Sequence, residues 1–180
     1  IKAKAIRNGR ESNVTEETLT YNLATMHPIT LKCEPDEKFT YKGANLLVDG
    51  MTGDDNYRSG RYIGIYGQDF DATIDLQEPK EISSVSLGTY LVPGDYIFGL
   101  TGLEVYGSED GKTYSKIASK AIPTLEKGSK NNVLKRDTVN FDKTKTRYVQ
   151  IIGKNTPVLP KWHPGAGKQT YLFLDEIAVN

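Results

Sequence analysis

Hydrophobic and polar residues alternate along much of this chain, as they do in half-buried β-strands. Four segments show the alternation most clearly, and all four are rich in the β-branched and aromatic residues that favour strands. No window of comparable length has the period of an amphipathic helix. The pattern therefore predicts strands at residues 72–76, 82–87, 103–106 and 147–152.

Turn-forming dipeptides separate the predicted strands. Short strands with regular turns are typical of an all-β sandwich or barrel. Residues 108–114 predict a hairpin, because Asp-Gly tolerates the positive φ values of a type I′ turn. The reversing dipeptides are Asp49-Gly50, Pro93-Gly94, Asp110-Gly111 and Pro164-Gly165.

The beginning of the chain has a pattern of its own. Residues 1–7 and 12–21 predict two strands joined at Asn8-Gly9, a dipeptide that favours tight hairpin turns. The chain begins at Ile1 without an initiator Met or a signal sequence, so we expect it to belong to a longer protein. We therefore predict two regions, with residues 1–24 as the C-terminal hairpin of a preceding β-domain and residues 25–180 as one β-domain.

Composition limits the classes of protein that fit. The 180 residues suffice for one ordinary hydrophobic core, and no apolar run is long enough to cross a bilayer. Lys and Arg number 23 and so do Asp and Glu, so the net charge offers no attraction for nucleic acid. The single cysteine, Cys33, cannot form an internal disulfide or a cysteine-based zinc site, and we expect it to pack as a small hydrophobic residue.

Motifs of several enzyme classes are missing from the sequence. The two histidines, His27 and His163, form no paired zinc motif, and there is no Gly-x-Ser-x-Gly elbow. Residues 165–168 imitate the end of a phosphate-binding loop, but Gln169 follows where that loop has Ser or Thr. We therefore predict a domain that is not an enzyme.

Two hydrophobic runs near the two ends of the chain each deliver a carboxylate to an expected strand edge. Residues 44–50 include Asp49, and residues 171–179 include Glu176. If the first and last parts of a β-sandwich lie side by side, these two carboxylates meet and can hold one hard cation. The alternative is that Asp49 only begins a turn and that Glu176 is a solvated charge.

The ordered landmarks of the chain resemble those of the F5/8 type C, or discoidin, domain family, which includes the family 32 carbohydrate-binding modules. The resemblance covers residues 25–180. It implies an all-β, antiparallel jelly-roll β-sandwich whose termini lie close together. The landmarks are residues 45–50, 74–76, 82–87, 103–114, 148–151 and 175–177.

Many members of that family hold a structural calcium ion near the first strands. Carried over to this chain, the resemblance implies Ca²⁺ bound by the side chains of Asp49 and Glu176. Oxygens of the turn around Asn45 and Met51 would complete the shell, because calcium accepts about six to eight oxygens. Residues 53–56 depart from the Thr-containing loop usual at this place, so the remaining ligands stay open.

A sugar site needs an aromatic face for the C–H side of a pyranose ring and planar or bidentate polar groups for pairs of hydroxyls. Aromatic residues occur in the turn-rich segments 56–62, 90–96 and 157–167, and in the family fold these loops converge at one end of the sandwich. The candidate sugar-binding residues are Tyr57, Arg58, Tyr90, Trp162 and His163.

These candidates have expected roles and structural alternatives. Trp162 or Tyr90 would be the stacking platform, while Arg58 and His163 would bind hydroxyls. Alternatively, Trp162 packs its loop onto the sheet and His163 anchors that loop by hydrogen bonds. Tyr57 and Arg58 would then be solvated loop residues.

Residues 160–167 and 171–173 look closest to versions at the C-terminal end of bacterial glycoside hydrolases of the β-hexosaminidase or chitobiase type. The resemblance implies a non-catalytic carbohydrate-binding module that tethers a covalently attached glycoside hydrolase to glycans of the galactose or N-acetylhexosamine type. It implies a monomer exported to the periplasm or cell surface of a bacterium, without a nucleic-acid partner or membrane insertion. Two other functions remain open: a ligand-free spacer that stabilises the catalytic domain, and a protein-adhesion discoidin domain.

Overall fold

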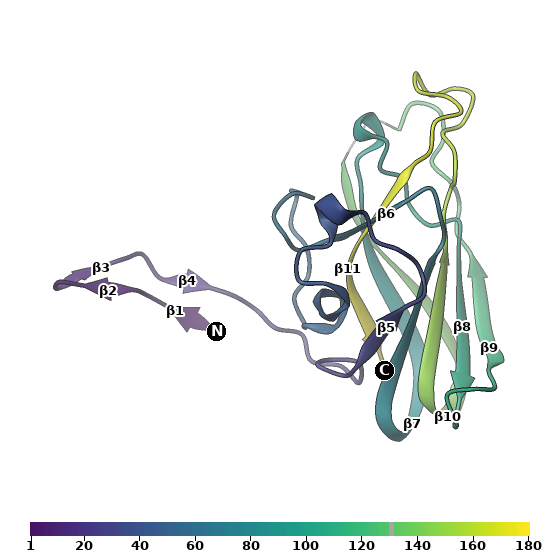
Figure 1. Cartoon of the computed structure of the whole chain (residues 1–180), viewed down its shortest axis with the longest axis horizontal. Helices are drawn as coiled ribbons and strands as arrows, with labels where there is room; N and C mark the ends of the chain where they lie inside the picture. The colour runs from purple at the N-terminus through teal and green to yellow at the C-terminus, as the bar shows by residue number, and fades with distance from the viewer. Residues whose placement is uncertain (130–131) are drawn as a thin grey trace.

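The computed structural model describes residues 1–129 and 132–180. Its regular structure is almost entirely β (Figure 1). In this described part, no helix is long and apolar enough to cross a membrane. The strands are β1 (Lys2–Ala3), β2 (Ile6–Arg7), β3 (Arg10–Glu11), β4 (Thr15–Glu16), β5 (Ile29–Leu31), β6 (Ile63–Tyr66), β7 (Phe70–Leu91), β8 (Gly102–Ser108), β9 (Ser115–Ala121), β10 (Val133–Lys154) and β11 (Tyr171–Val179). The short 3₁₀ helices are η1 (Glu37–Phe39), η2 (Ala44–Val48) and η3 (Pro93–Asp95).

The long strands β7 and β10, of 22 residues each, belong to both layers of a sandwich. They pair antiparallel along their whole length, with register shifts in β10 between Asn140 and Thr144 and between Thr146 and Tyr148. Such shifts bend a strand and increase its twist. One layer has the order β5-β7-β10-β8-β9, and the other has the order β6-β11-β7-β10. The predicted strands at 72–76 and 82–87 are therefore two parts of β7.

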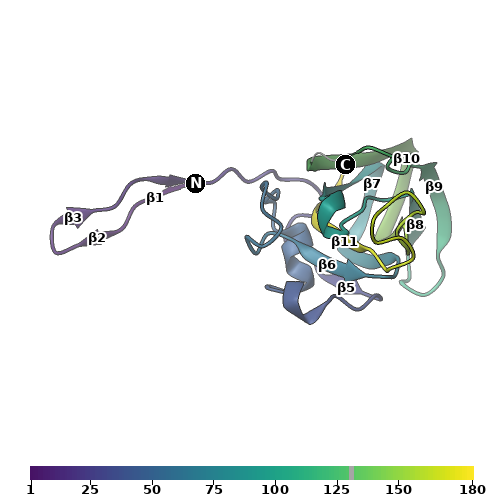
Figure 2. The ribbon, with the colours of Figure 1, turned by 90° about the horizontal axis from the view of Figure 1, so that it is seen from above.

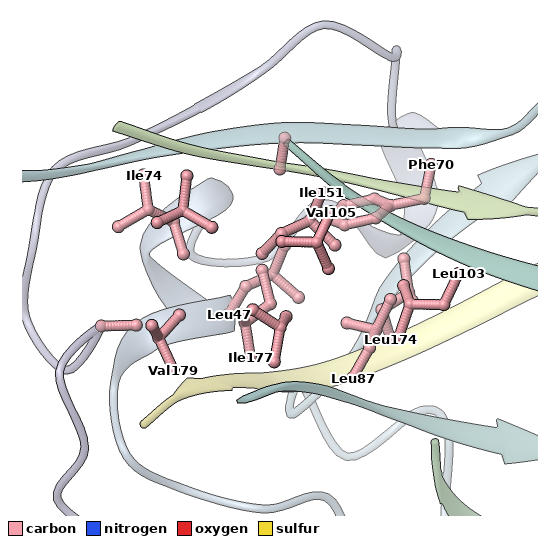
Figure 3. Packing of buried hydrophobic residues seen from close by; sticks show 14 of the residues in the cluster. Leu47, Phe70, Ile74, Leu87, Leu103, Val105, Ile151, Leu174, Ile177 and Val179 are labelled. Carbon is pink, nitrogen blue, oxygen red and sulfur yellow. The ribbon is translucent and has the colours of Figure 1, made fainter. Parts of the chain in front are cut away.

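Apolar side chains of both layers meet in one core (Figure 3). In the first part of β7 every second residue is buried, namely Phe70, Ala72, Ile74 and Leu76. This alternation confirms the strand predicted there. Figure 3 shows core side chains from the strands and from η2, among them Leu47, Phe70, Ile74, Leu87, Leu103, Val105, Ile151, Leu174, Ile177 and Val179.

The beginning and the end of the sandwich lie side by side. The N–H of Leu23 donates to the carbonyl of Val179 over 2.9 Å. The buried side-chain oxygen Oδ1 of Asn22 accepts from the N–H of Ala24 over 2.8 Å and from that of Val179 over 3.1 Å. The expected closeness of the two ends is therefore confirmed.

The loop between β8 and β9 differs from the predicted type I′ turn. The two strands form the expected antiparallel hairpin, but only Gly111 has a positive φ, of 70°. The Oδ1 atom of Asp110 instead accepts from the N–H groups of Lys112 and Thr113, over 2.8 and 2.9 Å. A turn built on an Asp side chain replaces the tight backbone reversal, because the connection spans more residues than a type I′ turn allows.

Residues 1–17 form a narrow ribbon that extends away from the sandwich in both views (Figures 1 and 2). β1 pairs with β4, and β2 pairs with β3. Asn8 and Gly9 have φ values of 52° and 74°, which confirms the reversal predicted at this dipeptide. β4, which corresponds to the strand predicted at residues 12–21, ends at Glu16.

A bidentate ion pair connects this ribbon to the sandwich. The guanidinium nitrogens Nη1 and Nη2 of Arg61 lie 2.6 and 2.7 Å from the two carboxylate oxygens of Glu17. These hydrogen bonds lower the pKa of Glu17. Next to the pair, the N–H of Thr20 donates to the carbonyl of Gly50 over 2.8 Å.

Arg61→Ala is expected to increase the motion of the ribbon, because an isolated two-stranded ribbon is only marginally stable. Heteronuclear NOE values of residues 1–17 should fall, while the melting temperature changes little, since a partly exposed ion pair at the edge of the sandwich contributes little to stability. Lys4→Ala, which removes the Lys4–Glu11 pair inside the ribbon, is the matched control. Unaltered NOE values in Arg61→Ala would contradict the connection.

Candidate functional site

A hollow of about 630 Å³ lies at the end of the sandwich where η1, η3 and the loop before β6 meet β11. Residues from four separate parts of the sequence form its wall. Two sequence-predicted residues, Tyr57 and Arg58, belong to it. The lining residues are Lys38, Phe39, Tyr41, Tyr57, Arg58, Gly94, Asp95, Tyr96, Ile97, Tyr171 and Phe173.

Aromatic rings form the base of this hollow. The ring of Phe39 meets those of Tyr57, Tyr171 and Phe173 edge-on, with centroids 6.1, 5.7 and 4.8 Å apart. Tyr57 also meets Phe173 edge-on at 5.1 Å. Phe173, in β11, is only 1% exposed, so these aromatic rings are attached to β11 and to the core beneath it.

Polar groups stand directly beside these rings. The hydroxyl of Tyr57 donates to Oδ2 of Asp95 over 2.9 Å, and the Arg58 guanidinium lies 5.0 Å from the centroid of the Tyr57 ring. Burial, and then the bond to Asp95, raise the pKa of Tyr57, so its hydroxyl keeps its proton and remains a donor. The planar donors of Arg58 and a carboxylate acceptor therefore sit next to an aromatic surface, as recognition of a polyol ring requires.

Tyr41 is an aromatic residue of this hollow that the sequence analysis missed. It is 46% exposed, and its ring lies against the backbone at Gly60. The signal was present, because Tyr41 stands two residues before Gly43 in an irregular segment, the same context that singled out Tyr57. The other lining residues that were not among the candidates are Lys38, Phe39, Gly94, Asp95, Tyr96, Ile97, Tyr171 and Phe173.

Tyr90 does not offer a face to a ligand, which corrects its expected role as a stacking platform. Its side chain is 3% exposed. The ring stacks on that of Tyr62, with centroids 5.7 Å apart, and the hydroxyl donates to the carbonyl of Asp55 over 2.8 Å. Tyr90 therefore supports the loop before β6 from within the core.

His163 is also buried, at 7% exposure, and both of its ring nitrogens have partners. Nε2 lies 3.0 Å from the carbonyl of Pro93, and Nδ1 accepts from the N–H of Gly165 over 3.0 Å. The two bonds together require the tautomer with its proton on Nε2. His163 thus anchors its loop, as in the structural alternative, and has no ring nitrogen left for a sugar hydroxyl.

His163→Phe is expected to lower stability by about 1–3 kcal/mol, because an aromatic ring still fills the site while the Pro93 carbonyl and the Gly165 N–H lose their hydrogen-bond partners. In a domain of this size that corresponds to a fall in melting temperature of roughly 2–10 °C, measurable by calorimetry. Thr113→Val, which changes a polar side chain on the distant β8–β9 loop, is the control. A variant that melts like the wild type but loses glycan binding would instead restore the role of hydroxyl partner.

Trp162 lies outside the hollow around Tyr57. It is half-buried, and its ring is tilted by 36° against that of Phe98, with centroids 6.1 Å apart. The structure thus brings Tyr57 and Arg58 together but places Trp162 in a neighbouring hollow, on the other side of Gly94.

Glu176 lies beside Asp49 and the turn that follows it, although Glu176 is 126 residues after Gly50 in the sequence. The N–H of Gly50 lies 3.2 Å from both Glu176 oxygens, and the N–H of Met51 donates to Oδ1 of Asp49 over 2.9 Å. Glu176 is 2% exposed. Burial, and then the Asp49 charge, raise the pKa of Glu176 to about 8.

This arrangement fits a cation. Nη1 of Arg136 lies 3.2 Å from the backbone oxygen of Glu176, and Nη2 lies 3.5 Å from Oδ1 of Asp175. Arg136 therefore binds these two oxygens and not the side-chain carboxylate of Glu176. Within residues 1–129 and 132–180, no three His, Cys, Asp or Glu side chains converge as metal ligands. Further ligands would therefore be backbone oxygens, which calcium accepts. Of the two remaining candidates, Met51 adjoins the pair, whereas the Asn45 side chain is exposed in η2.

A comparison with models of protein families identifies the family of this chain. The model of the F5/8 type C domain matches residues 32–172. The chain belongs to the F5/8 type C family. The family expected from the sequence landmarks is thus confirmed, whereas a comparison with curated protein sequences finds no match.

Several solved structures share the fold of this F5/8 type C domain. CpGH89CBM32-5 from Clostridium perfringens, in complex with GalNAc-β-1,3-galactose, has a TM-score of 0.54 at 20% identity, over 84% of this chain and 93% of its own. CBM32-1 from a family 31 glycoside hydrolase of the same organism has 0.55 at 22%, over 88% and 96%. The lectin domain of lectinolysin, complexed with Lewis b antigen, has 0.57 at 19%, over 91% and 98%. At these identities the likeness concerns the fold, and it confirms the predicted jelly-roll β-sandwich.

Proposed function

We propose that this F5/8 type C domain binds carbohydrate in the hollow around Tyr57 and Arg58. The observation that carries the proposal is the arrangement of half-buried aromatic rings, the exposed Arg58 guanidinium and the exposed Asp95 carboxylate in one hollow. A pyranose ring has an apolar C–H face that packs on aromatic surfaces, and its paired hydroxyls match planar donors and carboxylate acceptors.

The described structural neighbours support the type of ligand. CpGH89CBM32-5 is in complex with GalNAc-β-1,3-galactose, and the lectin domain of lectinolysin is complexed with Lewis b antigen. We extend this to glycans of the galactose or N-acetylhexosamine type for the present domain. Affinity should be modest, with a dissociation constant on the order of 0.1 mM, because a shallow site buries little area and sugar hydroxyls give up hydrogen bonds to water.

The biological role that fits weak binding is that of a tether. A non-catalytic module attached to a glycoside hydrolase, such as a β-hexosaminidase, would raise the local concentration of the enzyme at its glycan substrate. In this proposal the domain is a monomer exported by a bacterium, and the ribbon of residues 1–17 is the C-terminal hairpin of a preceding β-domain. Residues 1–16 are exposed throughout, which supports this division, whereas Asn22 and Ala24, assigned to the hairpin from the sequence, are buried in the sandwich.

We further propose that Ca²⁺ binds between Asp49 and Glu176. The buried position of the Glu176 carboxyl group beside the half-buried carboxylate of Asp49 supports a cation at this place, since a buried negative charge next to a second one is costly without a cation. Its role would be structural, because it would join the η2 turn to β11.

A glycan microarray tests carbohydrate binding directly. The array should carry galactose, GalNAc, GlcNAc and fucose with their oligosaccharides, including GalNAc-β-1,3-galactose and Lewis b. We expect binding to at least one series, and titration of the same sugar by NMR should shift amide signals near residues 57–58 and 94–96. Binding with signal shifts confined to another face would contradict the assigned hollow.

A ligand-free spacer is the second candidate, and the burial of Tyr90 and His163 favours it, because these two residues were expected at the sugar surface. The array separates the two functions. Failure to bind any glycan would leave the spacer as the function that fits.

A further inference from the structure

A second hollow, of about 530 Å³, adjoins the one around Tyr57. It lies between the loop that carries Trp162 and the segment before β10. The η3 turn separates the two hollows, and Gly94 in that turn lines both of them. The remaining lining residues of the second hollow are Pro93, Lys127, Gly128, Ser129, Trp162, His163 and Pro164.

The distance between the two hollows is held constant by buried contacts. His163 bonds to the carbonyl of Pro93 over 3.0 Å, and its ring meets that of Tyr96 edge-on at 5.4 Å. Phe98 contacts both His163 and Trp162, with ring centroids 5.7 and 6.1 Å away. The Trp162 loop is therefore attached to the same η3 turn that forms a wall of the first hollow.

The second hollow has the chemistry of a sugar subsite. The half-buried Trp162 ring and the rings of Pro93 and Pro164 give it an apolar surface, which suits the C–H face of a pyranose. Lys127 and Ser129 supply hydrogen-bonding groups at its edge. The second hollow can therefore take the C–H face of a hexose or N-acetylhexosamine unit on Trp162, with Lys127 and Ser129 near its hydroxyls.

Between the hollows, the surface over Gly94 is open. A Cβ atom added to Gly94 would meet no other atom within 4 Å, and Gly94 is not in the left-handed region, so its backbone suits any residue. Nothing in the neighbourhood of Gly94 thus stands in the way of a ligand that passes from one hollow to the other.

We infer that this domain recognises a glycan of at least two sugar units, with one unit at Tyr57 and Arg58, a linkage that crosses Gly94, and a further unit against Trp162. The inference rests on the proposed carbohydrate-binding function and adds a second subsite to it. It also gives the domain a preference for oligosaccharides over monosaccharides, because both units contribute to binding while the cost of association arises once.

The experiment compares four proteins, namely the wild type, Gly94→Leu, Gly94→Ala and Trp162→Ala, in titrations followed by NMR or calorimetry. The probes are galactose and GalNAc as monosaccharides, and GalNAc-β-1,3-galactose and Lewis b as longer ligands. Gly94→Leu places bulk on the passage, whereas Gly94→Ala tests whether the backbone tolerates a side chain. Melting temperatures identify any variant that does not fold.

For the wild type we expect a longer ligand to bind about 10-fold more tightly than its monosaccharide. Trp162→Ala should remove this advantage and leave the monosaccharide affinity unchanged. Gly94→Leu, which lies at the edge of both hollows, should weaken the longer ligand more than the monosaccharide, and Gly94→Ala should keep the preference for the longer ligand. Equal affinity of the wild type for mono- and oligosaccharides, or an unchanged preference in Gly94→Leu, overturns the second subsite but leaves the proposed function intact. Binding to no sugar of any length overturns the proposed function, and the second subsite with it.

Discussion

Arg58→Ala is expected to weaken glycan binding about 10- to 100-fold without a change in fold. Hydrogen bonds to a charged group contribute about 1.5–3 kcal/mol, and removal of the guanidinium loses those that it makes to sugar hydroxyls. Arg58 is exposed, so its truncation leaves the core untouched. Titration with the strongest ligand from the array, together with a thermal melt, measures both parts of the expectation.

Arg10→Ala is the matched control for this variant, because it removes an exposed arginine on the ribbon, far from the hollow. Its affinity should equal that of the wild type. Tyr57→Phe adds a milder test, since it keeps the ring but releases Asp95 from its hydrogen bond. If Arg58→Ala binds glycan as tightly as the wild type, the sugar site lies outside this hollow.

Removal of calcium is expected to lower the melting temperature by about 5–10 °C. A ligand that binds only the folded state and is present at about 100 times its dissociation constant stabilises by about 2.7 kcal/mol. In a domain of this size each kcal/mol corresponds to roughly 2–4 °C. The measurement is a pair of calorimetric scans, one with excess Ca²⁺ and one with a chelator.

Glu176→Gln makes this prediction specific to the proposed site. The amide keeps the shape of the side chain but removes one of the two carboxylates, so Ca²⁺ should no longer raise the melting temperature. In the presence of a chelator the variant should be at least as stable as the wild type. The raised pKa of Glu176 means that the buried carboxyl group must take up a proton or stay charged beside Asp49, and Gln avoids this cost. Glu109→Gln, on the exposed β8–β9 loop, should keep the full response to Ca²⁺. If neither Ca²⁺ nor the chelator changes the melting temperature of the wild type, the proposed calcium site is excluded.

Local sequence patterns determined much of the fold. Alternation at 72–76 predicted a strand with one buried face, because each second side chain of a strand points to the same side. Asn8-Gly9 predicted its hairpin turn, since the required positive φ values depend on these two residues alone. The meeting of Asp49 and Glu176 was also predictable, but through the order of family landmarks rather than through any local preference.

Some features of the fold depended on contacts between distant segments. The joining of 72–76 and 82–87 into β7 follows from pairing with β10, whose paired residues lie at least 50 positions further along the chain than these two segments. Likewise, the loop at Asp110 adopted a side-chain turn in place of the expected type I′ turn, because the ends of β8 and β9 determined its length.

The sequence alone determined which kinds of residue serve a sugar site: aromatic rings and planar polar groups in turn-rich segments. Only the tertiary structure decided which of them are available. Tyr57 and Tyr90 are the same residue in similar contexts, yet Tyr90 stacks on Tyr62 in the core while Tyr57 lines an open hollow. Exposure is the physical reason for the difference, because it depends on which distant segments cover a side chain, and no local pattern contains that information.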